Sequence, residues 1–152
     1  MDKILISKCL LGENVKYNGG NNKIENPVIE KWKKEGRLIP ICPEVDGGLP
    51  TPRPPSEIQN NLVINNCGCD VTEEFVSGAK IACEKAKSAG AKYALMKQGS
   101  PSCGSKMIYD GTFSKTKKAG LGIAAKMLTD MGIRIFDESE IDILDNIIET
   151  VK

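Results

Sequence analysis

The sequence contains no histidine, and this absence narrows the chemistry open to the chain. A catalytic triad and a Cys-His dyad both need an imidazole, and most mixed Cys/His zinc sites need one too. Any acid–base step must therefore fall to carboxylates, lysine, tyrosine, serine or water.

The chain also lacks an excess of either charge, since 21 Lys and Arg oppose 20 Asp and Glu for a formal net charge of +1. With so small a net charge, the sequence shows no excess of positive charge that would attract nucleic acid or an anionic membrane. No apolar run is long enough to span a bilayer, and Met1-Asp2 leads into a strand-like run without the zones of a signal peptide. We therefore expect a cytoplasmic protein without nucleic-acid or membrane partners.

Cysteine is present six times in a chain of 152 residues. In a reducing compartment these thiols are expected to be buried hydrophobes, metal ligands or reactive groups rather than a disulfide framework. The length fits one domain, and we expect a single domain over residues 1–152.

Short apolar runs alternate with helical patterns along the chain. Strands are predicted at residues 3–7, 38–41, 93–97 and 133–136. Helices are predicted at residues 26–35, 72–88, 120–131 and 139–151. This order predicts an α/β fold of three layers, Rossmann-like, with a mostly parallel sheet and helices on both faces.

Two further segments are predicted as hairpins. Residues 62–64 are expected to pair with residues 56–58, and residues 107–113 are expected to form a small flap that turns at Asp110-Gly111. The prolines and glycines of residues 42–55 predict an irregular loop without helix, of a length that is typical of functional loops. Lys115 to Lys118 is interpreted as a solvated run before a helix.

Three cysteines share one position relative to the predicted strands. Cys9, Cys42 and Cys103 each follow an apolar run and lie in loops rich in Gly, Pro, Ser and Asn. If the strands are parallel, the three thiols meet at the sheet edge where α/β proteins bind ligands. Burial as small hydrophobes is the alternative. Three thiolates without histidine would suit a soft metal or an iron–sulfur cluster with one open, Lewis-acidic iron.

Polar residues near these cysteines have alternative roles. Glu44 could activate water beside the metal or remain a solvated acid. Ser100 and Ser102 could orient a water or close the turn. Arg53 could bind an anionic or carbonyl-bearing ligand, or could pair with Glu57.

Two short motifs carry weaker signals. The spacing of Cys67-Gly-Cys69 would allow metal chelation or a strained disulfide, although no second pair supports a zinc site. Gly120-Leu-Gly122 lacks the preceding strand and the third glycine of a dinucleotide-binding turn.

The order of these motifs resembles that of the thiouracil desulfidase family. The resemblance rests on Ser7-Lys-Cys-Leu-Leu-Gly12 with Tyr17-Asn-Gly19, on Cys42-Pro-Glu-Val-Asp-Gly-Gly-Leu-Pro-Thr-Pro-Arg53, and on Ser100-Pro-Ser-Cys-Gly104 with Ile108-Tyr-Asp-Gly-Thr-Phe113. It implies one compact domain with a [4Fe-4S] cluster held by Cys9, Cys42 and Cys103. It also assigns the handling of the attacking water to Glu44 and Ser100.

The resulting hypothesis is a non-redox desulfidase that hydrolyses the C–S bond of a small thiolated compound, such as 2- or 4-thiouracil, and acts as a monomer or weak homodimer. One alternative is a metal- or redox-sensing protein with zinc or a labile cluster at the thiols. A sulfur-inserting enzyme is the other, although such an enzyme acting on tRNA would be expected to carry a basic patch.

Overall fold

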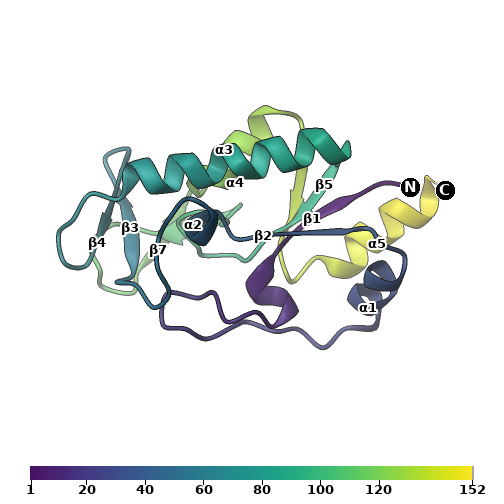
Figure 1. Ribbon diagram of the computed structural model, residues 1–152, viewed down its shortest axis with the longest axis horizontal. Coiled ribbons are helices and arrows are strands. Elements are labelled where there is room, and N and C mark those ends of the chain that lie inside the picture. Colours follow the sequence, from purple (N-terminus) through teal and green to yellow (C-terminus); the bar gives the residue numbers. More distant parts are fainter. Residues whose placement is uncertain (152) are drawn as a thin grey trace.

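The computed structural model describes residues 1–151, and a parallel sheet of four strands forms its centre. The strand order is β2-β1-β5-β8 (Figure 1). The strands are β1 (Ile4–Ser7), β2 (Leu38–Ile41), β5 (Tyr93–Leu95) and β8 (Arg134–Phe136). The predicted parallel sheet is thus confirmed, and all carboxyl ends of its strands lie at one edge.

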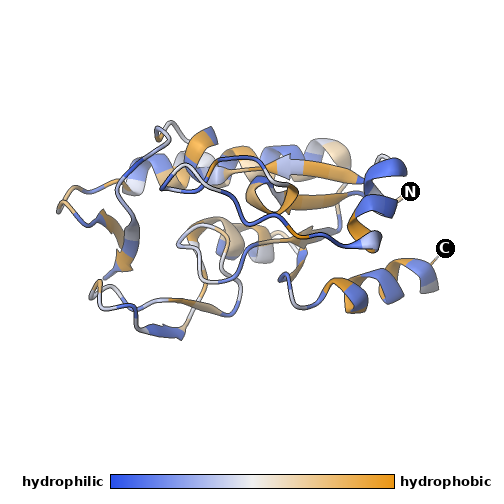
Figure 2. Cartoon of the chain, turned by 90° about the horizontal axis from the view of Figure 1, so that it is seen from below, coloured by the Kyte–Doolittle hydropathy of each residue, from blue (hydrophilic) through white to orange (hydrophobic). Residues whose placement is uncertain are grey.

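The consecutive apolar residues of β1 pack into two separate hydrophobic cores. Ile4 and Ile6 pack beneath α1 (Pro27–Lys34) and α5 (Ile141–Thr150), whereas Leu5 packs beneath α3 (Thr72–Ala89) and α4 (Ile123–Asp130). Alternate side chains of a strand point to opposite faces, so a strand covered on both faces must be apolar throughout. Figure 2 shows hydrophobic residues along the central strands, and hydrophobic residues that alternate with hydrophilic ones along the helices. Helices therefore cover both faces, as predicted.

Within residues 1–151, no helix combines the length and the apolar character that crossing a membrane requires.

The loop of residues 42–55 contains a helix, so the expectation of a wholly irregular segment is wrong. Helix α2 (Pro43–Asp46) starts at a proline, which the first turn tolerates because the N–H groups there have no partner within the helix. The carboxylate of Asp46 accepts a hydrogen bond from Cys42 N at 3.2 Å and closes this turn.

Helix α2 approaches α3 backbone to backbone. A Cβ added at Gly78 would collide with the carbonyl group of Pro43, and one added at Gly47 would collide with the carbonyl oxygen of Glu74. The two glycines therefore let α2 lie directly on α3, which fixes the position of the residues that α2 carries.

Two antiparallel hairpins flank the sheet. Strands β3 (Ser56–Gln59) and β4 (Leu62–Asn65) pair as predicted. Strand β6 (Met107–Tyr109), however, pairs with β7 (Lys117–Ala119) rather than with residues just after Asp110-Gly111. All three residues of β7 are exposed, so this strand has no apolar pattern by which the sequence could identify it.

Candidate active site

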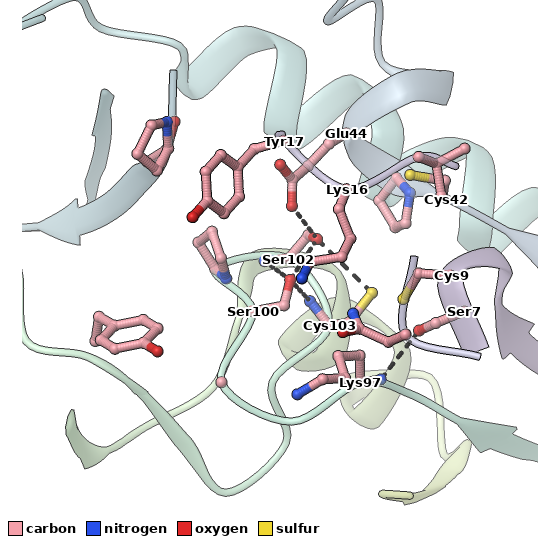
Figure 3. Close-up of a pocket in the computed structure, with 18 of the residues that line it drawn as sticks. Ser7, Cys9, Lys16, Tyr17, Cys42, Glu44, Lys97, Ser100, Ser102 and Cys103 are labelled. Carbon is pink, nitrogen blue, oxygen red and sulfur yellow. Dashed lines mark hydrogen bonds between the residues drawn. The ribbon is translucent and has the colours of Figure 1, made fainter. Parts of the chain in front are cut away.

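The three predicted cysteines line one cavity of about 590 Å³ at the carboxyl edge of the sheet. Cys9 lies on a 3-10 helix, η1 (Lys8–Leu11), directly after β1; Cys42 follows β2, and Cys103 lies in the loop after β5. Figure 3 shows their sulfur atoms facing the same space. The fold thus brings together thiols that are far apart in the sequence.

Each of the three thiols has a hydrogen-bond donor beside it. The Asn22 side chain donates a hydrogen bond to Cys9, the backbone N–H of Val45 donates one to Cys42, and the Ser7 hydroxyl donates one to Cys103. Lys97 N donates to Ser7 Oγ at 3.1 Å, which leaves the Ser7 proton directed at Cys103 (Figure 3). These donors favour thiolates over thiols. Sequence reasoning missed Asn22, Val45 and Ser7 in this role, because it depends on loop geometry.

Burial nevertheless raises the pKa of all three thiols. For Cys103 the pKa rises to about 12, since burial and the neighbouring Cys9 and Cys42 outweigh the hydrogen bonds from Ser7 and Ser102. Thiols in such a setting ionise when they bind a cation, because metal binding displaces the protons.

The donor set of the cavity fits an iron–sulfur cluster. Three thiols face it from three separate segments of the chain, each beside a hydrogen-bond donor, as is usual for the sulfur ligands of clusters. Within residues 1–151, no three Cys, Asp or Glu side chains are arranged to hold a single metal ion.

Glu44 projects from α2 into the same cavity, with a donor on each carboxylate oxygen (Figure 3). Arg53 Nε donates to Oε1 at 3.0 Å, and Ser102 Oγ donates to Oε2 at 3.0 Å. The alternative pairing of Arg53 with Glu57 is wrong. Glu57 instead accepts hydrogen bonds from the backbone N–H groups of Gly111 and Phe113, and so holds the loop between β6 and β7.

Ser100 closes the turn that carries Cys103. Its Oγ accepts hydrogen bonds from the backbone N–H groups of Ser102 at 3.1 Å and Cys103 at 3.0 Å. It also lies 2.9 Å from Ser102 Oγ. Ser102 is therefore the serine in direct contact with Glu44, and Ser100 reaches the carboxylate through it.

The rest of the wall combines aromatic rings with ammonium groups. Tyr17, Tyr109 and Phe113 line the cavity. Lysines also line it, at positions 8, 16, 97, 115 and 117. Lys115 to Lys118 are exposed, as expected of a solvated run, and Lys115 and Lys117 also line the cavity.

A network of side chains holds the Cys103 loop from behind. Gln98 Nε2 donates to Asp137 at 3.0 Å, Gln98 Oε1 accepts from Met107 N at 2.8 Å, and Lys106 pairs with Asp137 at 3.0 Å. Burial opposes ionisation of Asp137, but hydrogen bonds from Ser139, Lys106 and Gln98 outweigh it and lower its pKa to about 2.

The remaining cysteines lie outside the cavity lining. Cys67 and Cys69 are exposed in the turn after β4, where both backbone N–H groups donate to Asn65 Oδ1. Cys83 is half-buried in α3 against the core. All three are free thiols.

Fold and site together define a Rossmann-like α/β protein with a thiol-lined cavity suited to an iron–sulfur cluster. Residues 4–140 match the model of the 2-thiouracil desulfurase family, and the chain belongs to that family.

Two relatives match nearly their whole length. The "Uncharacterized protein YbbK" of Bacillus subtilis (strain 168) is 39% identical over 149 residues, which cover 91% of this chain and 97% of that protein. The solved structure of the [4Fe-4S]-dependent thiouracil desulfidase TudS (DUF523Vcz) is 42% identical, with a TM-score of 0.96 and 99% coverage of both chains.

Proposed function

We propose that the chain is a [4Fe-4S]-dependent desulfidase that converts a thiouracil to the corresponding oxo base. The observation that carries this proposal is the meeting of three thiols and one doubly anchored carboxylate in a single cavity. The family and the name of the relative TudS support the same reaction. In balanced form, thiocarbonyl and water give carbonyl and hydrogen sulfide, so no electron donor is required.

Cys9, Cys42 and Cys103 would hold the cluster. Three protein ligands leave one iron of a four-iron cluster without a thiolate, and this iron supplies a Lewis acid for the thiocarbonyl sulfur when the cluster is bound. The hydrogen-bond donors beside the three sulfurs stabilise their thiolate forms.

Glu44 would act as the general base for the attacking water. Its two oxygens each receive one donor, which fixes the plane of the carboxylate while leaving acceptor positions free toward the cavity. The water O–H bond breaks as its proton passes to Glu44, the oxygen forms a bond to the thiocarbonyl carbon, and the C=S π electrons move to sulfur. The C–S bond then breaks as the C=O bond forms, and the sulfur leaves as hydrogen sulfide with the proton held by Glu44 and the remaining hydroxyl proton. Ser100, in the adjoining loop, completes the hydrogen-bond network around the base.

The aromatic side chains Tyr17, Tyr109 and Phe113 would contact the planar ring of the substrate, because flat rings pack well against one another. The excess of positive charge around the cavity favours a substrate whose sulfur is electron-rich, and it stabilises the sulfide product.

Several broader expectations belong to the same proposal. The chain would act as one domain over residues 1–152, in the cytoplasm, as a monomer or weak homodimer. Its partner would be the small thiolated substrate, without nucleic acid or membrane. The balanced charge of the sequence supports this restriction to small molecules.

The Glu44→Gln variant tests the role of the carboxylate. It should keep the iron and sulfide content and the visible spectrum of the wild type, while turnover of 4-thiouracil falls at least about 100-fold. Glu84→Gln, at an exposed position on α3, is the matched control and should remain active. A Glu44→Gln variant with full activity would show that another group activates the water.

A further inference from the structure

A second carboxylate lines the cavity and has no part in the proposed handling of water. Glu57 lies on β3, is 8% exposed, and lines the same cavity as the three thiols and Glu44. Only one of its oxygens is engaged, since Oε1 accepts hydrogen bonds from Gly111 N at 2.9 Å and from Phe113 N at 3.2 Å. Within residues 1–151, Oε2 has no hydrogen-bond partner, and Glu57 forms no ion pair.

The free oxygen of Glu57 opens onto the cavity. A carboxylate oxygen that is largely removed from water and has no donor costs free energy, so such groups usually have a partner in the working protein. In the described part of the chain, Trp32 Nε1 is the one side-chain polar atom that is both sealed from solvent and without a partner, so Glu57 Oε2 is not sealed. Its open side faces the cavity, because the Glu57 side chain lines the cavity and is otherwise buried.

The loop between β6 and β7 is held without this oxygen. Strand β3 anchors Gly111 twice, because its N–H donates to Glu57 Oε1 and its carbonyl oxygen accepts from Gln59 Nε2 at 2.6 Å. Glu57 and Gln59 are two residues apart on the strand, so their side chains share one face. The structural role of Glu57 therefore uses one oxygen and leaves the other as a free acceptor.

The same carboxylate ties an aromatic residue of the cavity wall in place. Phe113, whose N–H donates to Glu57, has a φ of +56°, a left-handed conformation that L residues rarely adopt. Phe113 and Tyr109 line the cavity together with Glu57. An acceptor among flat aromatic rings suits a planar heterocycle that carries an N–H group, because the rings pack against its faces and the acceptor pairs with its edge. A thiopyrimidine base has such N–H groups at its two ring nitrogens.

We propose that Glu57 recognises the ring of the substrate, with Oε2 accepting a hydrogen bond from a ring N–H group of the thiopyrimidine. This inference rests on the proposed function, because it names a binding contact for that substrate. The two carboxylates then have separate roles, in which Glu44 takes the proton of the attacking water and Glu57 holds the ring. A site built to pair with a substrate N–H rejects an analogue that lacks it, because the acceptor is then left unpaired.

Glu57→Gln tests this contact in the cluster-loaded protein, compared with wild type at equal iron content. The substitution keeps the shape and the acceptor for Gly111 and Phe113 but replaces Oε2 with an NH2 donor. The Kd for uracil, which has N–H groups at the same positions as 4-thiouracil, and the KM for 4-thiouracil should both rise at least about 10-fold, while kcat stays within about threefold. Gln59→Ala is the matched control, since it removes the other anchor of Gly111 from outside the cavity lining, and its Kd for uracil should stay within about threefold of wild type.

Methylated bases separate hydrogen bonding from shape. 1-Methyluracil and 3-methyluracil each lack one ring N–H group. Wild type should bind one of them at least about 10-fold more weakly than uracil, and in Glu57→Gln this preference should fall to within about threefold. An equal preference for uracil in both proteins would show that the methyl group is excluded by shape, and it would overturn the proposal.

The proposal is also overturned if Glu57→Gln binds uracil as tightly as wild type, if wild type does not distinguish the three bases, or if Gln59→Ala weakens binding as much as Glu57→Gln. A failure of the proposed function would appear differently, as an active Glu44→Gln variant. The affinities for uracil need no turnover, so they test Glu57 in that case too. Loss of turnover in Glu44→Gln together with unchanged uracil affinity in Glu57→Gln would reject only the role of Glu57.

Discussion

Arg53 and Glu44 form a largely buried ion pair, with Nε 3.0 Å from Oε1 and side-chain exposures of 4% and 15%. The same guanidinium also donates to the carbonyl of Val15 at 2.9 Å and to Thr51 Oγ1 at 3.1 Å. One side chain therefore ties the proposed base to the proline-rich loop and to the segment that precedes Tyr17.

Arg53→Lys should lower both activity and stability. A lysine keeps the charge but cannot make the same set of planar contacts, so we expect kcat to fall at least about 10-fold and the free energy of unfolding to fall by about 2 kcal/mol. Steady-state kinetics and urea unfolding measure the two effects. Arg37→Lys is the matched control, because Arg37 is also buried and paired, 2.8 Å from Glu35, but lies outside the cavity lining. Equal loss of activity in both variants would show that Arg53 acts through stability alone.

Gly78→Ala should destabilise the protein, although alanine favours a helix by about 1 kcal/mol over glycine. The added methyl group would collide with the carbonyl of Pro43 and push α2 away from α3, at a cost of about 1–3 kcal/mol. Because α2 carries Glu44, activity should fall as well. Thermal unfolding and kinetics provide the test, with the exposed Ser77→Ala on the same helix as control. A more stable and fully active Gly78→Ala would refute the close contact of the two helices.

Acid should weaken the support of the Cys103 loop. Hydrogen bonds lower the pKa of Asp137 from 3.8 to about 2 in the folded protein, in spite of its burial. A depressed pKa contributes stability that is complete above the unfolded value, and this stability is lost as the pH falls from about 4 toward 2. The shift corresponds to about 2 kcal/mol.

Urea unfolding of the metal-free protein at pH 6 and pH 3 measures this contribution. Asp137→Asn should be less stable than wild type at pH 6, and the difference should shrink at pH 3. Asp142→Asn, at an exposed position on α5, is the control and should show no such convergence. A difference between Asp137→Asn and wild type that stays constant with pH would rule out this contribution.

Much of the fold is predictable because its signals are local. The apolar residues of β1 alternate between two hydrophobic cores. Because helices cover both faces of this strand, the side chains on both faces must be apolar. Strand order is not predictable in this way, since it depends on which strands meet after folding. The pairing of β7 is not predictable because Lys117–Ala119 is exposed and has no apolar pattern. Helix α2 is not predictable because the many prolines of residues 42–55 argue against a helix, although one turn starts at Pro43.

The candidate site, too, is predictable only in part from the sequence. The meeting of Cys9, Cys42 and Cys103 could be predicted, because parallel strands deliver their following residues to one edge. The contact between Ser102 and Glu44 could not, because it depends on which way neighbouring serines point within one turn. That direction is set by the backbone N–H groups that occupy Ser100 Oγ.

The central claim is that Cys9, Cys42 and Cys103 hold a cluster on which desulfuration depends. The most direct test is anaerobic purification with iron, sulfide and zinc analysis and a visible spectrum, followed by addition of 4-thiouracil while its near-ultraviolet thiocarbonyl band is recorded. We predict about four irons per chain and loss of that band, with both abolished in Cys103→Ala and both retained in Cys83→Ala. Zinc or no metal in the anaerobic wild type, or an iron-loaded and active Cys103→Ala, would contradict the account.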